Sequence, residues 1–226
     1  MNGPINRALR WLFFNVLVRG FVLLALGLSV RHRERLPGQG PAILVANHNS
    51  HLDTLILMSL LPPAQLARVR PVAAGDYFLR NRWLAWFARE IIGIIPIQRG
   101  GAGHGNPLAP VDQALERGEI VIFFPEGTRG EPEQLAPLKK GIRHLALHHP
   151  EVPVIPLWIQ GAGRALPRGE ALFVPFFCDV AVGHALYGQQ AGADWMERLK
   201  RDLLALRDSL PPLQWYQGRV DEDADR

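Results

Sequence analysis

The stretch PAILVANHNSHLDTLILMSLL, residues 41–61, joins two apolar runs through a short polar segment. The first run, residues 42–47, is almost entirely apolar, which predicts a strand buried on both faces. Residues 50–61 are predominantly apolar and end at two prolines, which predicts a helix. A strand that leads directly into a helix is the repeating unit of a parallel sheet.

The same alternation continues along the rest of the chain. Further strands are predicted at 70–74, 119–124 and 152–159, with other apolar runs at 91–98 and 171–183, the latter expected to add edge strands. Further helices are predicted at 76–90, 111–118, 138–149 and 194–210, and a loop at 100–110. Strands that alternate with helices need crossover connections, so we expect an α/β fold whose mostly parallel central sheet is flanked by helices. One domain is expected over 37–215, followed by a mobile acidic tail at 216–226.

The composition narrows the class of protein. The chain has 226 residues, of which 48% are hydrophobic, and a formal net charge of +4. Its mean hydropathy of +0.02 is too low for a polytopic membrane protein. The single cysteine, Cys178, rules out an intrachain disulfide framework, and its apolar setting is expected to raise its pKa. The basic surface suits an anionic lipid or a phosphorylated substrate, and since no readout motif accompanies it, we expect no nucleic-acid partner.

The N-terminal segment, residues 1–36, is expected to associate with a membrane. Residues 11–30 are apolar and long enough to cross a bilayer, but Arg19 lies in the middle. An arginine at the centre of a lone spanning helix costs about 2.5–3.5 kcal/mol, which favours a helix lying shallow with Arg19 reaching to the lipid headgroups. A buried core helix is the alternative.

Polar residues follow several of the predicted strands. They occur in NHNSHLD at 47–53, PIQRGG at 96–101, PEGTRG at 125–130 and QGAGR at 160–164. In parallel sheets, ligands bind outside the carboxyl ends of the strands. These segments are therefore expected to form one site.

His48 and Asp53 are the candidate catalytic pair. A residue just before a helix can fold back on its first turn, so the Asp53 carboxylate could hold one imidazole nitrogen and leave the other as a base. Ser50 to Asp53 also has the form of a helix-capping box, and both interpretations stay open. His48, His51 and Asp53 could be metal ligands, but the spacing matches no metallohydrolase motif and no cysteine pair adds to it, so no metal is expected.

The turn FFPEGTRG, residues 123–130, is the candidate anion site. Its amides, hydroxyl and guanidinium could hold phosphate oxygens, although an ordinary turn would have the same sequence. Further cations stand at neighbouring strand and helix ends. The candidate residues are Glu126, Gly127, Thr128, Arg129, Arg99 and Lys139.

Four motifs in order resemble those of the glycerolipid acyltransferases, most like the bacterial 1-acylglycerol-3-phosphate acyltransferases. They are NHNSHLD, GIIPIQR at 93–99, FPEGTRG at 124–130 and VIPLWIQGAG at 154–163, and the resemblance covers roughly 40–185. It implies a mostly parallel sheet flanked by helices and bound to a membrane by the N-terminal helix. It also implies transfer of an acyl chain from acyl-CoA or acyl-carrier protein, as co-substrate, to the free hydroxyl of a lysophospholipid, with no cofactor.

The same resemblance implies roles for the candidate residues. His48 would be the general base and Asp53 its orienting partner, whereas the acceptor headgroup would be bound by Arg99, Glu126, Gly127, Thr128, Arg129 and Lys139. Lysophosphatidic acid is the first choice of acceptor. Because Gln98 stands where relatives often carry an acidic residue, another lyso-lipid, such as a lyso-ornithine lipid, is an alternative. The alternative to an enzyme is a catalytically inactive lipid-binding membrane protein. The expected location is peripheral or monotopic at the inner (cytoplasmic) membrane, with the site facing the cytoplasm.

Overall fold

The computed structural model describes residues 3–75, 81–98, 106–165 and 177–212. These residues form a seven-stranded sheet with the strand order β1-β7-β6-β2-β5-β3-β4. Its strands are β1 (Ser29–Arg31), β2 (Ala42–Ala46), β3 (Val69–Ala74), β4 (Ile95–Ile97), β5 (Ile120–Phe123), β6 (Val154–Gln160) and β7 (Asp179–Val182). All neighbouring strands pair in parallel except β6 and β7, which are antiparallel. The predicted mostly parallel sheet is confirmed.

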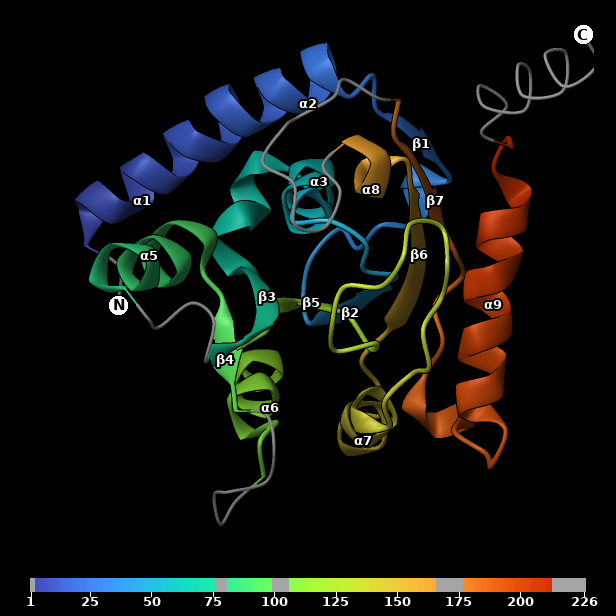
Figure 1. The fold of residues 1–226 in the computed structure, drawn as a ribbon. Helices are drawn as coiled ribbons and strands as arrows, with labels where there is room; N and C mark the ends of the chain where they lie inside the picture. Colours follow the sequence, from blue (N-terminus) through green and yellow to red (C-terminus); the bar gives the residue numbers. More distant parts are fainter. Residues whose placement is uncertain (1–2, 76–80, 99–105, 166–176, 213–226) are drawn as a thin grey trace, which may run out of the picture.

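Helices cover both faces of this sheet (Figure 1). The first face carries α1 (Pro4–Leu12), the π-helical η1 (Phe13–Val18), α2 (Arg19–Ala25), α3 (Leu52–Leu60) and the short α8 (Ala162–Ala165). The second face carries α6 (Ala109–Glu116), α7 (Gly141–His148) and α9 (Trp195–Ser209). The remaining helical segments are η2 (Arg33–Arg35), η3 (Pro63–Arg68), α5 (Arg82–Trp86), the π-helical η4 (Phe87–Ile92) and η5 (Gly188–Gln190). Alternate residues of the buried strands enter the two apolar clusters, because successive side chains of a strand point to opposite faces.

The register of the central strands brings the polar motifs together. Val45 of β2 pairs with Phe123 of β5 on one side and with Pro156 of β6 on the other. The residues that follow β2 and β5, which include His48 and Glu126, therefore leave the sheet side by side.

Two details of the sheet differ from the sequence prediction. The segment 171–183 was expected to add edge strands, but β7 lies inside the sheet because β1 pairs with it along Ser29 and Asp179. Strand β1 has only three residues, which is too short to give a periodic signal. Residues 171–176 and the predicted tail lie outside the described residues.

The N-terminal helix, formed by α1, η1 and α2, packs on the sheet with one face and exposes the other. Phe14, Val18, Val22 and Leu26 are buried in the core, as the core-helix alternative predicts. Outside these positions the helix exposes large apolar residues: Ile5, Leu9, Trp11, Leu12, Val16, Leu17 and Leu24. Among the described residues, no helix has both the length and the apolarity needed to cross a membrane.

Two arginines fix this helix to the rest of the domain. Arg10, which is only 4% exposed, donates from Nη2 to the carbonyl of Val69 at 2.8 Å, and burial lowers its pKa to about 10. Arg19 donates from Nη2 to the carbonyl of Leu61 at 2.6 Å. The expectation that Arg19 reaches out to lipid headgroups is therefore wrong, because a backbone carbonyl at the end of α3 lies within its reach.

Candidate active site

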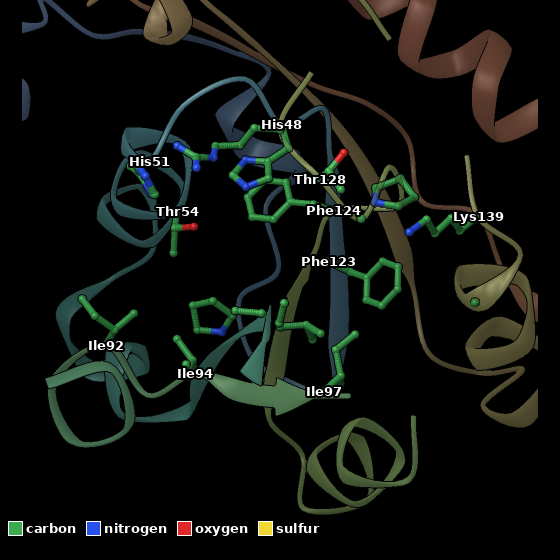
Figure 2. A pocket seen from close by; sticks show the side chains of 18 of the residues that line it. His48, His51, Thr54, Ile92, Ile94, Ile97, Phe123, Phe124, Thr128 and Lys139 are labelled. Atoms are coloured by element: carbon green, nitrogen blue, oxygen red, sulfur yellow. The ribbon is translucent and has the colours of Figure 1, made fainter. Parts of the chain in front are cut away.

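His48 and Asp53 form a hydrogen-bonded pair at the carboxyl end of β2. Nδ1 of His48 lies 2.9 Å from Oδ2 of Asp53, and the imidazole stacks on the ring of Phe124 with centroids 4.1 Å apart. Asp53 is 1% exposed, whereas the His48 side chain is 20% exposed and lines the neighbouring cavity (Figure 2). Because Asp53 is bonded to Nδ1, Nε2 of His48 is left for a substrate proton.

The capping and catalytic interpretations of Asp53 both describe the structure. The oxygen that meets His48 also accepts from the backbone amides of Asn49 at 2.7 Å and Ser50 at 2.8 Å. The Ser50 hydroxyl in turn accepts from the amide of Leu52 at 3.2 Å. One carboxylate thus closes the start of α3 and orients His48.

Glu126 holds the backbone of His48. Its Oε1 accepts from the His48 amide at 2.8 Å, and its Oε2 accepts from the Ala136 amide at 2.9 Å. The Gly130 amide donates to the His48 carbonyl at 2.8 Å. Glu126 is 4% exposed, its burial raises its pKa, and it is not among the described residues that line the cavity. The described contacts of Glu126 are thus to the backbone around His48, whereas the resemblance implied a contact to the acceptor headgroup.

Two asparagines support the same loop and were not singled out from the sequence. The side chain of Asn47 donates to the Ile159 carbonyl at 2.8 Å and accepts from the Ile159 amide at 2.7 Å, which extends the pairing of β2 with β6. Asn49 is 2% exposed, and its amide, oriented to suit its neighbours, donates to the His48 carbonyl and accepts from the Glu133 amide. The sequence did contain a signal for this role, because an asparagine stands on each side of His48, directly after a buried strand.

A cavity of about 630 Å³ lies in front of His48. His48, Thr128 and Lys139 lie toward one side of it, and Ile92, Ile94 and Ile97 line the other side (Figure 2). The polar residues are His48, His51, Thr54, Gln98, Thr128, Arg129 and Lys139, and the large apolar residues include Phe13, Leu55, Val72, Phe87, Ile92, Ile94, Ile97, Leu108 and Phe123. Such a cavity fits an amphiphile whose polar part lies at His48 and whose chain lies between β3, β4 and the N-terminal helix.

Cations lie at the polar end of this cavity. Gly127 has a φ of +72°, and a side chain there would come within 2.6 Å of Nζ of Lys139, so the glycine lets the ammonium approach the turn. Partial burial and the charge of Arg129 lower the pKa of His51, which favours its neutral form. Gly127, Thr128, Arg129 and Lys139 are therefore brought together as predicted, whereas Arg99 lies outside the described residues.

Neither a metal nor a thiol centre is apparent in the part of the chain that the structure describes. It holds no group of three His, Cys, Asp or Glu side chains placed to bind a metal ion. Cys178 is buried, and burial, followed by the charge of Asp53, raises its pKa to about 12. The predicted direction of this pKa shift is confirmed.

The comparison with known proteins agrees with this geometry. A family model described as Acyltransferase matches residues 27–160, more than half of the chain. The chain belongs to the acyltransferase family. The matched range contains His48, Asp53 and the 124–130 turn, so the resemblance inferred from the four motifs is confirmed.

Several relatives of this chain are named as 1-acyl-sn-glycerol-3-phosphate acyltransferases. This chain is 30% identical over 162 residues to the 1-acyl-sn-glycerol-3-phosphate acyltransferase alpha of Homo sapiens, and the match covers 71% of this chain and 55% of that protein. It is 28% identical over 161 residues to the 1-acyl-sn-glycerol-3-phosphate acyltransferase of Bacillus subtilis (strain 168), covering 71% of this chain and 74% of that protein. The chain spans about half the length of the first curated relatives it matches.

A solved structure has the same fold as this chain. The crystal structure of the 1-acyl-sn-glycerophosphate (LPA) acyltransferase PlsC from Thermotoga maritima superimposes with a TM-score of 0.71 at 20% sequence identity. The match covers 89% of this chain and 78% of that chain. The α/β fold expected from the sequence is therefore confirmed.

Proposed function

We propose that this acyltransferase moves an acyl chain from a thioester, acyl-CoA or acyl-carrier protein, to the free hydroxyl of lysophosphatidic acid, which gives phosphatidic acid. One observation carries the proposal: the His48–Asp53 pair stands at the polar end of an otherwise apolar cavity. The names of the curated relatives support the choice of acceptor.

The reaction needs a base for the acceptor hydroxyl, stabilisation of the oxyanion that forms, and a well-placed thioester. Nε2 of His48 takes the proton of the acceptor hydroxyl as the oxygen attacks the thioester carbonyl, while Nδ1–H stays bonded to Asp53. The tetrahedral intermediate then collapses, the C–S bond breaks, and the thiolate takes the proton back from His48. The acyl chain ends as an ester of the acceptor, and the free thiol leaves.

The two ends of the cavity suit the two parts of these substrates. The apolar walls would bury an acyl chain, at about 0.8 kcal/mol for each buried CH₂ group. The acceptor phosphate would lie against the amides and hydroxyl of residues 127–128 and the charges of Arg129 and Lys139. Arg99 is proposed to add a further cation. Glu126 would contribute by holding the His48 loop.

The exposed apolar side of the N-terminal helix is proposed to lie in the surface of the cytoplasmic membrane. Phe13 of this helix packs edge to face on Phe87 of η4, with ring centroids 5.2 Å apart, so α5 lies beside it. Trp83 and Trp86 of α5 are exposed by 80% and 40% and would extend the same surface. Tryptophans favour the membrane interface. Flotation with anionic liposomes tests this, and a Trp83→Ser/Trp86→Ser variant that floats as well as the wild type would contradict it.

The acyl transfer is tested by thiol release from palmitoyl-CoA, with and without lysophosphatidic acid. We expect release that depends on the acceptor and falls about 10²- to 10⁴-fold in His48→Ala. His184→Ala, an exposed histidine away from the cavity, is the matched control. Equal turnover by both variants would remove His48 as the base. Release with a lyso-ornithine lipid and not with lysophosphatidic acid would change the acceptor, and silence with every donor and acceptor would favour an inactive lipid-binding protein.

A further inference from the structure

The solvent-facing side of α7 is positively charged around one exposed leucine. At about 100° per residue, the positions on this side fall within an arc of about 140°, opposite the buried Ile142, Leu145 and Ala146. We call these positions the α7 face: the exposed Lys140, which directly precedes the helix, the half-buried Arg143, and the exposed His144, Leu147 and His148. Leu147, near the middle of the arc, is 43% exposed.

Among the described residues, no acidic side chain pairs with the two permanent charges of this face, Lys140 and Arg143. The sequence from 139 to 150 contains no Asp or Glu. Within the described parts of the chain, neither Lys140 nor Arg143 forms a salt bridge or a side-chain hydrogen bond. The nearest acidic contact is Asp112, which lies 3.0 Å from Nε2 of His149 and 3.8 Å from Nδ1 of His148. The two permanent charges of the α7 face are thus available to a partner.

The position of the α7 face relates it to the active site and separates it from the proposed membrane surface. Lys139 and Gly141, on either side of Lys140, line the cavity that holds His48. Helix α7 packs on the opposite face of the sheet from the N-terminal helix (Figure 1). A protein bound to a membrane through its N-terminal helix would therefore turn the α7 face toward water.

We infer that the α7 face is the docking surface for an acidic carrier protein that presents the acyl group to His48 as a pantetheine thioester. This inference rests on the proposed acyl transfer. An exposed apolar side chain surrounded by cations has the layout of a protein interface, with an apolar centre and a charged rim. The phosphates of coenzyme A would need the cations alone, and Leu147 would be left exposed.

The experiment reverses the charge of the α7 face and compares two donors. The Lys140→Glu/Arg143→Glu variant is measured with palmitoyl-acyl-carrier protein and with palmitoyl-CoA, both with lysophosphatidic acid. We expect KM for the carrier protein to rise about tenfold or more and to lose its salt dependence, because reversing rim charges slows electrostatically steered association. Kinetics with palmitoyl-CoA should be unchanged, which also shows that the variant folds. Leu147→Ser should raise KM for the carrier protein alone.

Lys200→Glu/Arg201→Glu is the matched control, since it makes the same change of charge on the exposed side of α9, away from the cavity. An α7 variant that behaves like this control with the carrier protein would overturn the inference. Equal loss with both donors would also overturn it, because the face would then serve the phosphates of coenzyme A. Fluorescence anisotropy measures direct binding of the carrier protein to the wild-type chain and does not depend on turnover. If the wild-type chain binds the carrier protein and the α7 variant does not, the docking surface is supported even if the proposed reaction fails. If the wild-type chain does not bind the carrier protein, the docking surface is refuted and the proposed acyl transfer is unaffected.

Discussion

Oδ2 of Asp53 lies 2.9 Å from Nδ1 of His48 and also accepts from two backbone amides at the start of α3. The imidazole and the helix therefore share one anchor. The ring of Phe124 stacks on one face of the imidazole, so His48 is held by a stacking contact as well as by the hydrogen bond at Nδ1. In the proposed reaction, His48 would therefore have little freedom to lose on reaching the transition state.

Asp53→Asn is expected to lower kcat about 10²- to 10⁴-fold with a smaller change in KM for the acceptor, because an amide no longer favours the Nδ1–H tautomer. Steady-state thiol release with palmitoyl-CoA and lysophosphatidic acid measures both constants. Asp208→Asn, on the exposed side of α9, is the control. A kcat within threefold of the wild type would show that Asp53 serves the helix alone.

Glu126→Gln is expected to lower kcat about 10- to 100-fold while KM for the acceptor stays near that of the wild type. The reason is geometric: glutamine has one carbonyl oxygen, so the amides of His48 and Ala136 cannot both keep their acceptor. The split between kcat and KM decides the role of this residue. A large rise in acceptor KM at unchanged kcat would instead place Glu126 on the headgroup.

The stability of the Glu126→Gln variant is expected to depend on pH relative to the wild type. Burial raises the pKa of Glu126 in the folded protein. Its contribution to stability is therefore fully present below its unfolded pKa and is lost as pH rises through its folded pKa. The difference in unfolding free energy, wild type minus variant, should therefore fall as the pH rises above the unfolded pKa of a glutamate, about 4.3. Urea unfolding at several pH values measures it, and a difference that grows with pH would contradict the shift.

Gly127→Ala is expected to raise the acceptor KM, because the new side chain would displace the ammonium of Lys139. Gly118→Ala is a closely matched control: Gly118 has a φ of +73°, against +72° for Gly127, but open space around it. Both variants should lose about 1–2 kcal/mol of stability to the left-handed backbone. Only Gly127→Ala should change the kinetics, and equal kinetics in the two variants would remove Lys139 from the acceptor site.

Cys178→Ala is expected to keep near-wild-type turnover, since the cysteine takes no part in the proposed reaction. A pKa of about 12 leaves only about one thiol in 10⁴ ionised at pH 8. Titration of the folded protein with an aromatic disulfide at that pH should therefore be slow, and it should become fast in guanidinium chloride. Loss of turnover without loss of folding would reopen a covalent route through this residue.

Local sequence patterns were sufficient for most of the secondary structure. The apolar run at 42–47 and the helix expected at 50–61 correspond to β2 and α3, because periodicity and proline positions act over a few residues. The same patterns did not reveal β1. A three-residue strand forms because β7 offers it a partner, and that partner lies about 150 residues away in the chain.

By itself, the sequence determined the alternation of strands and helices, the pairing of His48 with Asp53, the turn at 124–130 and the family. These depend on the order and spacing of neighbouring residues. Only the tertiary structure decided three other features. Arg19 donates a hydrogen bond to the carbonyl of Leu61, Glu126 accepts one from the amide of His48, and a largely apolar cavity lies in front of His48. Each of these depends on which distant segments the sheet brings into contact, since the direction and burial of a side chain are set by its neighbours in space.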